Sequence, residues 1–179
     1  MDRPARILED SYAETRGSIK IRFASAADLK ALEWEGEYAH YRRLFKRAID
    51  EARHGRRILL LAEIREQVVG QIFVQLTTRA TFSTKGASSG YLYAFRVKAP
   101  YRNRGVGGQL LQEAEVSLAV RGFRRSVISV SKRNFAARRL YARAGYTVFT
   151  EDPGEWSYID HKGRLREVHE PALVMEKWL

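Results

Sequence analysis

Cysteine is absent from the 179-residue chain, and long hydrophobic runs are missing as well. Without cysteine there is no disulfide and no route through a cysteinyl thioester, and a cytoplasmic location is favoured. The longest apolar stretch, Ile58–Ala62, is far too short to cross a membrane, so we expect no membrane partner. The four histidines form no His-Glu-x-x-His pattern or comparable pair, and we therefore expect no metal.

Basic residues outnumber acidic ones by 32 to 21, which gives a net charge of +11 with the histidines neutral. Such a charge suits an acidic ligand or a nucleic acid. However, the charge is not concentrated in one long basic run, and no known nucleic-acid-binding motif is present. We therefore expect no nucleic-acid partner and interpret the arginines as mostly spread over solvated helix faces.

The length and a hydrophobic content of 45% are typical of one globular domain. We assign residues 19–179 to this domain and residues 1–18 to an N-terminal tail, or to an arm that packs on a partner. Residues 1–18 contain several acidic side chains and no apolar run, so they do not resemble a secretory signal. A homodimer is one assembly that such an arm would allow.

Alternating patterns of apolar and polar residues predict an α/β (α+β) domain. Strand-like segments occur at residues 19–23, 58–64, 68–76, 91–97, 127–130, 146–149 and 173–175. Helix-like segments follow Ser25, span residues 38–53, run from Val106 to a cap at Gly122, and lie between Asn134 and Gly145. Residues 77–90 are expected to be a loop and residues 154–170 a connecting segment. The prediction is a mixed, mostly antiparallel sheet of about six to seven strands, flanked by about four helices and bulged near Gly70.

The turn at residues 102–108 predicts an anion site. It reads Arg-Asn-Arg-Gly-Val-Gly-Gly and joins an apolar strand directly to a helix. The first N–H groups of a helix lack intrahelical partners, the helix dipole adds about half a positive charge, and glycines let a phosphate approach the backbone. A P-loop would need Lys-Ser or Lys-Thr after the glycines, and a dinucleotide site would need glycine in place of Leu110. Both nucleotide motifs are therefore incomplete, and a simple tight turn is the other interpretation.

Two blocks, in this order, resemble the GNAT superfamily of acyl-CoA-dependent N-acetyltransferases. Val97-x-Ala99-Pro100-Tyr101-Arg102-x-x-Gly105-Val106-Gly107 is similar to the family motif that cradles the pyrophosphate of coenzyme A, with the usual proline displaced by one place. Asn134-x-x-Ala137-x-x-Leu140-Tyr141, followed by Gly145-Tyr146, is similar to a second family signature. The resemblance implies a single GNAT-like acetyltransferase domain over residues 19–179, with acetyl-CoA as the acyl-donor cosubstrate and no metal.

The resemblance also implies a role for each matching residue. The backbone of Phe95, Arg96 and Val97 would pair with the pantetheine arm, and the Val97 amide would stabilise the thioester oxygen. Tyr141 would act as general acid toward the leaving thiolate, although a phenol of pKa about 10 donates a hydrogen bond to that thiolate more readily than a whole proton. From periodicity alone, Tyr141 is also a core aromatic of an amphipathic helix. The residues expected to bind the cosubstrate are Phe95, Arg96, Val97, Arg102, Asn103, Arg104, Gly105, Val106, Gly107, Gly108 and Asn134.

No general base is evident. At the two positions where family members carry a catalytic carboxylate, this chain has Ser129 and Tyr91. A lysine amine is neutral about once in 2,500 molecules at pH 7, whereas an α-amine is neutral roughly 10–20% of the time. The missing carboxylates therefore favour an acceptor of lowered pKa. The remaining candidate bases, each of which also fits a solvated surface, are Glu33, Glu35, Glu37, Glu155 and His161.

The acceptor is expected to be a primary amine of a small molecule, peptide or protein, attacking the thioester directly in a ternary complex. Its site would lie between the first two helices and residues 154–170, where Trp34, Glu35 and Trp156 are candidate lining residues. A non-catalytic acyl-CoA-binding sensor or regulatory module is the alternative function. Residues 86–90 also match the Gly-x-Ser-x-Gly elbow of hydrolases, but a loop precedes this match and a strand follows it, which is the reverse of the elbow.

Overall fold

The computed structural model describes residues 18–76 and 88–179. Residues 1–17 of the expected tail or arm lie outside the described residues, as do residues 77–87 of the expected loop, including Gly86 and Ala87 of the glycine-serine motif. Residues 89–90 belong to strand β4 (Ser89–Val97) and not to the expected loop, so a strand and not a helix follows Ser88 of that motif. In the described part of the chain, no helix is both long and apolar enough to cross a membrane.

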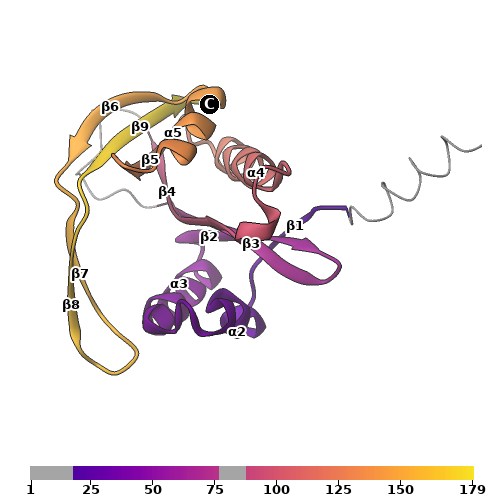
Figure 1. The fold of residues 1–179 in the computed structure, drawn as a ribbon. Coiled ribbons are helices and arrows are strands. Elements are labelled where there is room, and N and C mark those ends of the chain that lie inside the picture. Colours follow the sequence, from indigo (N-terminus) through magenta and orange to yellow (C-terminus); the bar gives the residue numbers. More distant parts are fainter. Residues whose placement is uncertain (1–17, 77–87) are drawn as a thin grey trace, which may run out of the picture.

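Seven strands form one sheet in the order β1-β2-β3-β4-β5-β9-β6 (Figure 1). All neighbouring strands are antiparallel except β4 and β5, which are parallel. The predicted mixed, mostly antiparallel sheet is therefore confirmed. The strands are Lys20–Phe23 (β1), Arg57–Ile64 (β2), Gln67–Gln75 (β3), Ser89–Val97 (β4), Arg125–Ser131 (β5), Thr147–Asp152 (β6) and Ala172–Trp178 (β9).

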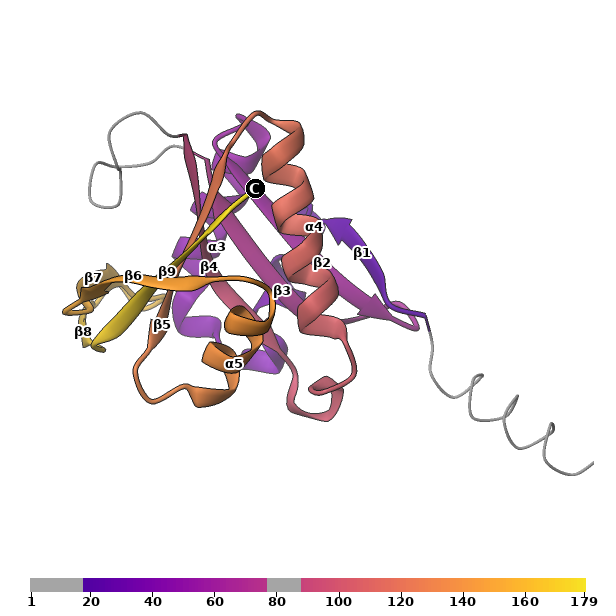
Figure 2. The same cartoon turned by 90° about the horizontal axis from the view of Figure 1, so that it is seen from above.

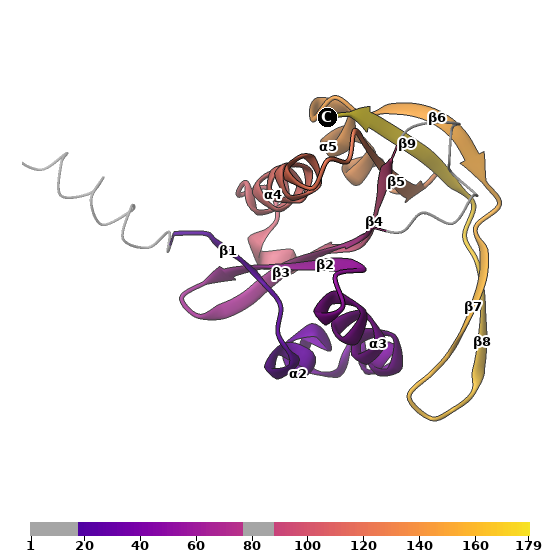
Figure 3. The ribbon, with the colours of Figure 1, turned by 180° about the vertical axis from the view of Figure 1, so that it is seen from behind.

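Helices cover both faces of this sheet. The helices α2 (Leu29–Leu32) and α3 (Arg42–Arg53) lie on one face, and α4 (Val106–Val120) and α5 (Phe135–Arg143) lie on the other (Figures 1 and 3). Seen from above, α4 crosses β2 and β3 (Figure 2). Short 3-10 turns complete the connections, namely Ala26–Asp28 (η1), Trp34–Gly36 (η2), Ala39–Tyr41 (η3) and Ala99–Tyr101 (η5).

The central strands are apolar on both sides because each face of the sheet is buried. In β2, Leu59 and Leu61 belong to one core cluster with α2 and α3, whereas Ile58 and Leu60 belong to another with α4. Successive side chains of a strand point to opposite faces, so a strand covered on both faces is a continuous apolar run. The predicted bulge is also present, because the β2–β3 register shifts where Ala62 pairs with Gly70.

Residues 154–170 are not the simple connection that the sequence predicted. They form a hairpin of two strands, Glu155–Ile159 (β7) and Leu165–His169 (β8), which pair only with each other. Figures 1 and 3 show this hairpin leaving the edge of the main sheet and running toward the side that carries α3. At its tip the Asp160 carboxylate accepts hydrogen bonds from the Lys162 and Arg164 amides at 2.9 Å. The strands were missed because both are largely exposed and therefore lack a buried apolar pattern.

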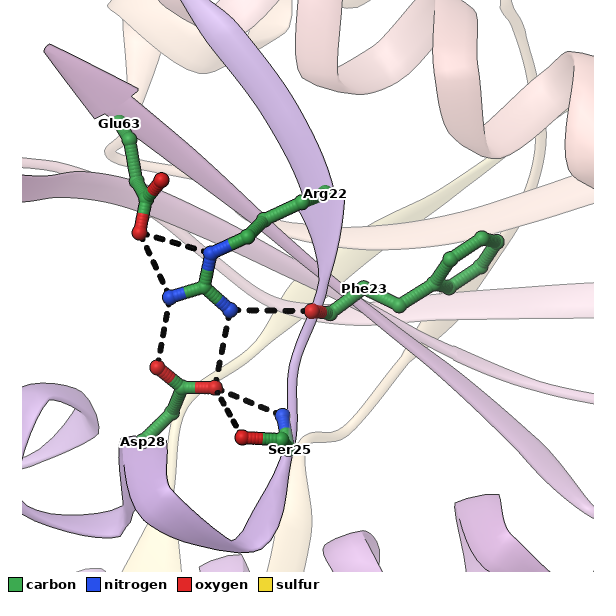
Figure 4. Close-up of polar contacts among 5 residues, drawn as sticks. All are labelled: Arg22, Phe23, Ser25, Asp28 and Glu63. Carbon is green, nitrogen blue, oxygen red and sulfur yellow. Dashed lines mark hydrogen bonds and ion pairs between the residues drawn. The ribbon is translucent and has the colours of Figure 1, made fainter. Parts of the chain in front are cut away.

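An ion-pair network fixes β1 to the start of the first helical segment (Figure 4). The Arg22 guanidinium donates to both carboxylate oxygens of Asp28, at 2.7 and 2.9 Å, and to Glu63 on β2 at 2.7 Å. The backbone N–H of Ser25 also donates to Asp28, at 2.7 Å. The hydrogen bond from Arg22 and those from Ser25 lower the pKa of the buried Asp28 to about 2, against the opposing effect of burial.

We expect Asp28→Asn to lower the free energy of unfolding by ~1–2 kcal/mol at pH 7, after allowance for solvent screening. The folded pKa is depressed, so the carboxylate stabilises the fold above its unfolded pKa and loses this contribution as the pH falls from about 4 toward 2. Urea unfolding of both proteins across this range measures the effect. The exposed change Asp50→Asn on α3 is the control, and a pH-independent deficit in Asp28→Asn would contradict the assignment.

Candidate functional site

The sheet opens between β4 and β5. Their parallel ladder runs from the Ser89–Arg125 pair to the Leu92–Ile128 pair and ends there, although both strands continue. A bulge deflects β4 at this point, because it has two residues between Tyr93 and Arg96 where β3 has one between Phe73 and Gln71. Ala94, within the bulge, has a φ of 48°. The ends of β4 and β5 are therefore free of each other.

A cavity of about 870 Å³ occupies this opening. It is lined by the ends of β4 and β5, by the turn that leads into α4, and by α5, which lies beside that turn in Figure 2. The volume is in the range of small-molecule and cofactor sites. The cavity brings together most of the residues predicted to bind the cosubstrate, namely Phe95, Arg96, Val97, Arg102, Asn103, Gly105, Gly107, Gly108 and Asn134, and also Tyr141.

Arg104 and Val106 do not line the cavity with the others. Arg104 is exposed, and the Val106 side chain is buried in the core. Hydrophobic burial explains the position of Val106, which begins the apolar face of α4 together with Leu110. The backbone amide of Val106, at the start of the helix, is suited to bind an anion, and its side chain is not.

The turn has the geometry that an anion site requires. Gly105 precedes α4 in the left-handed conformation, with a φ of 84°, and the first α-helical hydrogen bond runs from Gln109 N to Gly105 O at 3.0 Å. The amides of residues 106–108 therefore have no partner within the helix and point along its positive end. Arg102 turns back, and its Nε donates to Val97 O at 2.9 Å.

The two glycines in the first turn of α4 have different neighbours. A Cβ at Gly107 would lie 3.3 Å from Leu140 and 3.7 Å from the Phe95 ring, so this glycine lets α4 approach α5 and β4 closely. A Cβ at Gly108 would meet no protein atom within 4 Å, although Gly108 lines the cavity. Only Gly108 therefore leaves space that a ligand, rather than the protein, would use.

The β4 backbone offers a free amide to the cavity. The N–H of Lys98 donates to Val69 O on β3 at 2.8 Å. Successive N–H groups of a strand point to opposite sides, so the N–H of Val97 points away from β3. That side is the opening between β4 and β5, which is where the predicted oxyanion donor must lie.

Tyr141 lies on α5 with its ring between two other aromatic rings. The ring centroids of Phe95 and Tyr146 are 6.0 and 6.1 Å from it. Burial, and to a smaller degree the charge of Tyr91, raises the pKa of Tyr141 above its ordinary value. The hydroxyl therefore stays protonated at neutral and moderately alkaline pH and acts as a hydrogen-bond donor. Asn134 caps α5 as predicted, its side-chain oxygen accepting from Ala137 N at 3.1 Å.

The predicted acceptor residues Trp34, Glu35 and Trp156 do not line the cavity. Trp34 is buried, and its ring meets that of Tyr38 at 5.3 Å, while Trp156 on the hairpin stacks with Tyr41 at 6.4 Å. Tyr38 is the member of this aromatic group that lines the cavity, and the Arg96 guanidinium lies 4.3 Å above its ring. Glu35 is exposed and paired with Lys98 at 2.9 Å. The role of Trp34, Glu35 and Trp156 in binding an acceptor stays a prediction.

None of the five candidate bases lines the cavity. Glu33 is buried against Arg42 at 2.5 Å, and hydrogen bonding to that guanidinium lowers its pKa. Glu155 faces His169 at 3.4 Å, and Glu37 and His161 are exposed. Ser129 lines the cavity, whereas Tyr91 does not. Among the described residues, no group of three or more acidic, histidine or cysteine side chains is placed to hold a metal ion.

Tyr38, Tyr93, Arg143 and Glu170 are among the further lining residues that the sequence did not single out. Tyr93 and Arg143 lie within or next to the two sequence blocks quoted above. The strand and helix patterns could therefore have predicted that both residues lie at the cavity. Tyr38 and Glu170 come from segments far away in the sequence, and no local pattern marks either of them.

Comparison with known proteins agrees with this geometry. The family model described as acetyltransferase (GNAT) family matches residues 24–146. The fold is shared with the ribosomal-protein-S18-alanine N-acetyltransferase of Escherichia coli, at 19% identity and a TM-score of 0.68 over 90% of this chain and 94% of that one. It is also shared with the PaiA N-acetyltransferase of Thermoplasma acidophilum in complex with coenzyme A, at 19% identity and a TM-score of 0.67 over 90% and 99%.

A third solved structure with the same fold is Arabidopsis thaliana NAA60 in complex with acetyl-CoA, at 18% identity and a TM-score of 0.68 over 90% of this chain and 99% of that one. No curated protein sequence matches the chain significantly. The family model covers well over half of the chain, and it includes the turn before α4 and the helix with Asn134 and Tyr141. The chain therefore belongs to the acetyltransferase (GNAT) family.

Proposed function

We propose that this protein transfers an acetyl group from acetyl-CoA to a primary amine, by direct attack of the amine on the thioester in a ternary complex. The observation that carries the proposal is the opening between β4 and β5, which has unpaired helix amides at one end and the Tyr141 hydroxyl in the same cavity. Family membership and the coenzyme A and acetyl-CoA complexes of two proteins with this fold support it.

The donor would lie along β4. Its pyrophosphate fits the amides of residues 106–108, beside the open space at Gly108 and the positive charge of Arg102. Its pantetheine arm would pair with the free edge of β4, as an added strand pairs with a sheet. The thioester oxygen would then accept from the Val97 amide, which is placed to stabilise negative charge as that oxygen develops it.

Tyr141 would stabilise the thiolate as it leaves. As the C–S bond breaks, its hydroxyl donates a hydrogen bond to the sulfur, and the proton that finally neutralises the thiolate comes from the attacking nitrogen. Burial keeps this phenol neutral, so it is always a donor when the thiolate forms. Without cysteine the chain cannot hold the acetyl group as a thioester, which supports direct transfer.

A non-catalytic acyl-CoA sensor would use the same turn and the same β4 edge. It would have no use for a hydroxyl on α5 at the reacting end of the cavity, and this favours the enzyme. The two functions differ in one experiment, in which acetyl-CoA and a panel of primary amines are incubated with the protein. Binding of acetyl-CoA without acetylation of any amine would support the sensor.

Gly108→Val is expected to raise the Kd for coenzyme A at least about tenfold, since the added side chain would fill the space left for the pyrophosphate. The melting temperature should stay within about 2 °C of wild type, because no protein atom opposes the new Cβ. Calorimetric titration measures the affinity. Gln112→Val, at an exposed site one turn further along α4, is the matched control. Unchanged affinity in Gly108→Val would contradict the placement of the pyrophosphate.

Tyr141→Phe is expected to lower kcat about a hundredfold and to leave the KM for acetyl-CoA within about twofold, because the hydroxyl acts only as the thiolate leaves. Steady-state kinetics with a saturating amine tests this. Tyr146→Phe is the control, since it removes a hydroxyl from the neighbouring ring, where the partner is Ser126 at 2.6 Å, outside the cavity. Equal kcat in Tyr141→Phe and wild type would remove Tyr141 from the mechanism.

A further inference from the structure

Glu170 is the sole carboxylate among the described residues that line the cavity. The other lining residues are aromatic, apolar, small, neutral polar or cationic. In the described part of the chain the Glu170 carboxylate has no hydrogen-bond or ion-pair partner, and its side chain is exposed. The candidate bases named from the sequence differ from it, because Glu33, Glu35 and Glu155 are each paired with a basic side chain.

The backbone holds Glu170 firmly, although its side chain is free. Its N–H donates to Gly154 O at 3.0 Å, and a Cβ at Gly154 would lie 1.8 Å from Glu170 O, so the two ends of the hairpin cross in direct contact. Pro171 follows and restricts Glu170 to an extended conformation. The carbonyl of Pro171 accepts from Lys132 N at 3.2 Å, which ties this segment to the end of β5. The backbone of Glu170 is therefore fixed by this crossing of chains, and the residue lines the cavity.

Glu170 is the one negative charge that an ammonium group would meet among the described residues that line the cavity. The cations that line it are Arg96, Arg102 and Arg143, and Arg102 belongs to the phosphate turn. Because these cations repel an ammonium group, Glu170 is the charged group that can attract it. Burial raises the pKa of Tyr41, and the charges of Tyr158 and Glu170 raise it further, which places the carboxylate near the aromatic group on the acceptor side. Besides Glu170, the titratable and charged residues that line the cavity are Tyr38, Tyr93, Arg96, Arg102, Tyr141 and Arg143. Tyr41 does not line it but interacts electrostatically with Glu170.

We propose that Glu170 binds the ammonium group of the acceptor and removes one of its protons, a role that rests on the acetyl transfer proposed above. The neutral nitrogen then attacks the thioester carbonyl, so that a C–N bond forms and the C–S bond breaks. A second proton leaves the nitrogen and neutralises the thiolate, which is hydrogen-bonded to Tyr141. The products are the N-acetylated acceptor and coenzyme A, and Glu170 returns its proton to water.

This assignment explains how the chain can lack both carboxylates of the family positions. Ser129 lines the cavity from the sheet and Tyr91 does not line it, whereas Glu170 lines it from the base of the β7–β8 hairpin. The same opening is reached from a different side. An amine bound there would lie between the hairpin, the aromatic group and the exposed edge of β4.

The test compares Glu170→Gln with wild type on two aromatic amines of nearly the same shape. Phenethylamine is largely protonated at pH 7, whereas its side-chain difluorinated analogue is much less basic because fluorine withdraws electrons. A peptide with a free α-amine is included as a third acceptor. We expect Glu170→Gln to lower kcat/KM for phenethylamine about a hundredfold, and to lower it less than about fivefold for the difluorinated amine, which needs no base. The pH at which activity rises should shift upward only for phenethylamine.

Glu167→Gln is the matched control, since Glu167 is an exposed glutamate on β8 that does not line the cavity. Glu170→Asp should recover part of the lost rate, and coenzyme A affinity should be the same in every variant. Equal losses on both aromatic amines, or an unchanged pH profile in Glu170→Gln, would overturn the role of Glu170 while leaving the transfer reaction intact. If wild type acetylates none of the three amines although coenzyme A binds, the proposed function itself fails, and the role of Glu170 fails with it.

Discussion

The parting of β4 and β5 is the constraint on which the rest of the structure depends. Two parallel strands that stay paired leave no room between them, whereas here the ladder ends at Leu92 and Ile128 and a cavity follows. The extra residue near Ala94 turns β4 away, and β5 can leave it because β9 pairs along the whole length of β5 on the other side. On the outer sides of the opening, β4 thus stays paired with β3 and β5 stays paired with β9.

This opening has an energetic consequence. Backbone N–H and C=O groups are strong hydrogen-bonding groups, and leaving them unpaired and dry is costly. The Val97 N–H and the first amides of α4 are donors of this kind, and both face the same cavity, whereas the Val97 carbonyl already accepts from Arg102 Nε at 2.9 Å. A ligand that carries amides along part of its length and phosphates at one end satisfies both. The geometry therefore suits a ligand with amides along one part and phosphates at one end, and its negative charge is not the only property that matters.

The sequence predicted these donor-side features because they are local. Gly105, the α4 amides, Asn134 and Tyr141 are held by neighbours within a few residues, so spacing and capping rules applied directly. The role of Gly107 could not be predicted from the sequence, because this glycine also leaves room for Leu140, which is distant in the chain. The β7–β8 hairpin was missed since its strands pair only with each other and bury little apolar surface. Glu170 was missed because its place depends on the crossing at Gly154.

The two halves of the cavity are therefore built differently. The proposed donor half consists of two continuous segments, residues 93–108 and 128–143, whose positions are fixed by the central sheet and its helices. The proposed acceptor half is assembled from separate pieces, with Tyr38 before α3 and Glu170 at the base of an exposed hairpin. Changes in the hairpin would alter the second half without disturbing the core that holds the first. A fold divided in this way can keep one donor and change its acceptor. The residues that predict the donor therefore do not predict which amine is the acceptor.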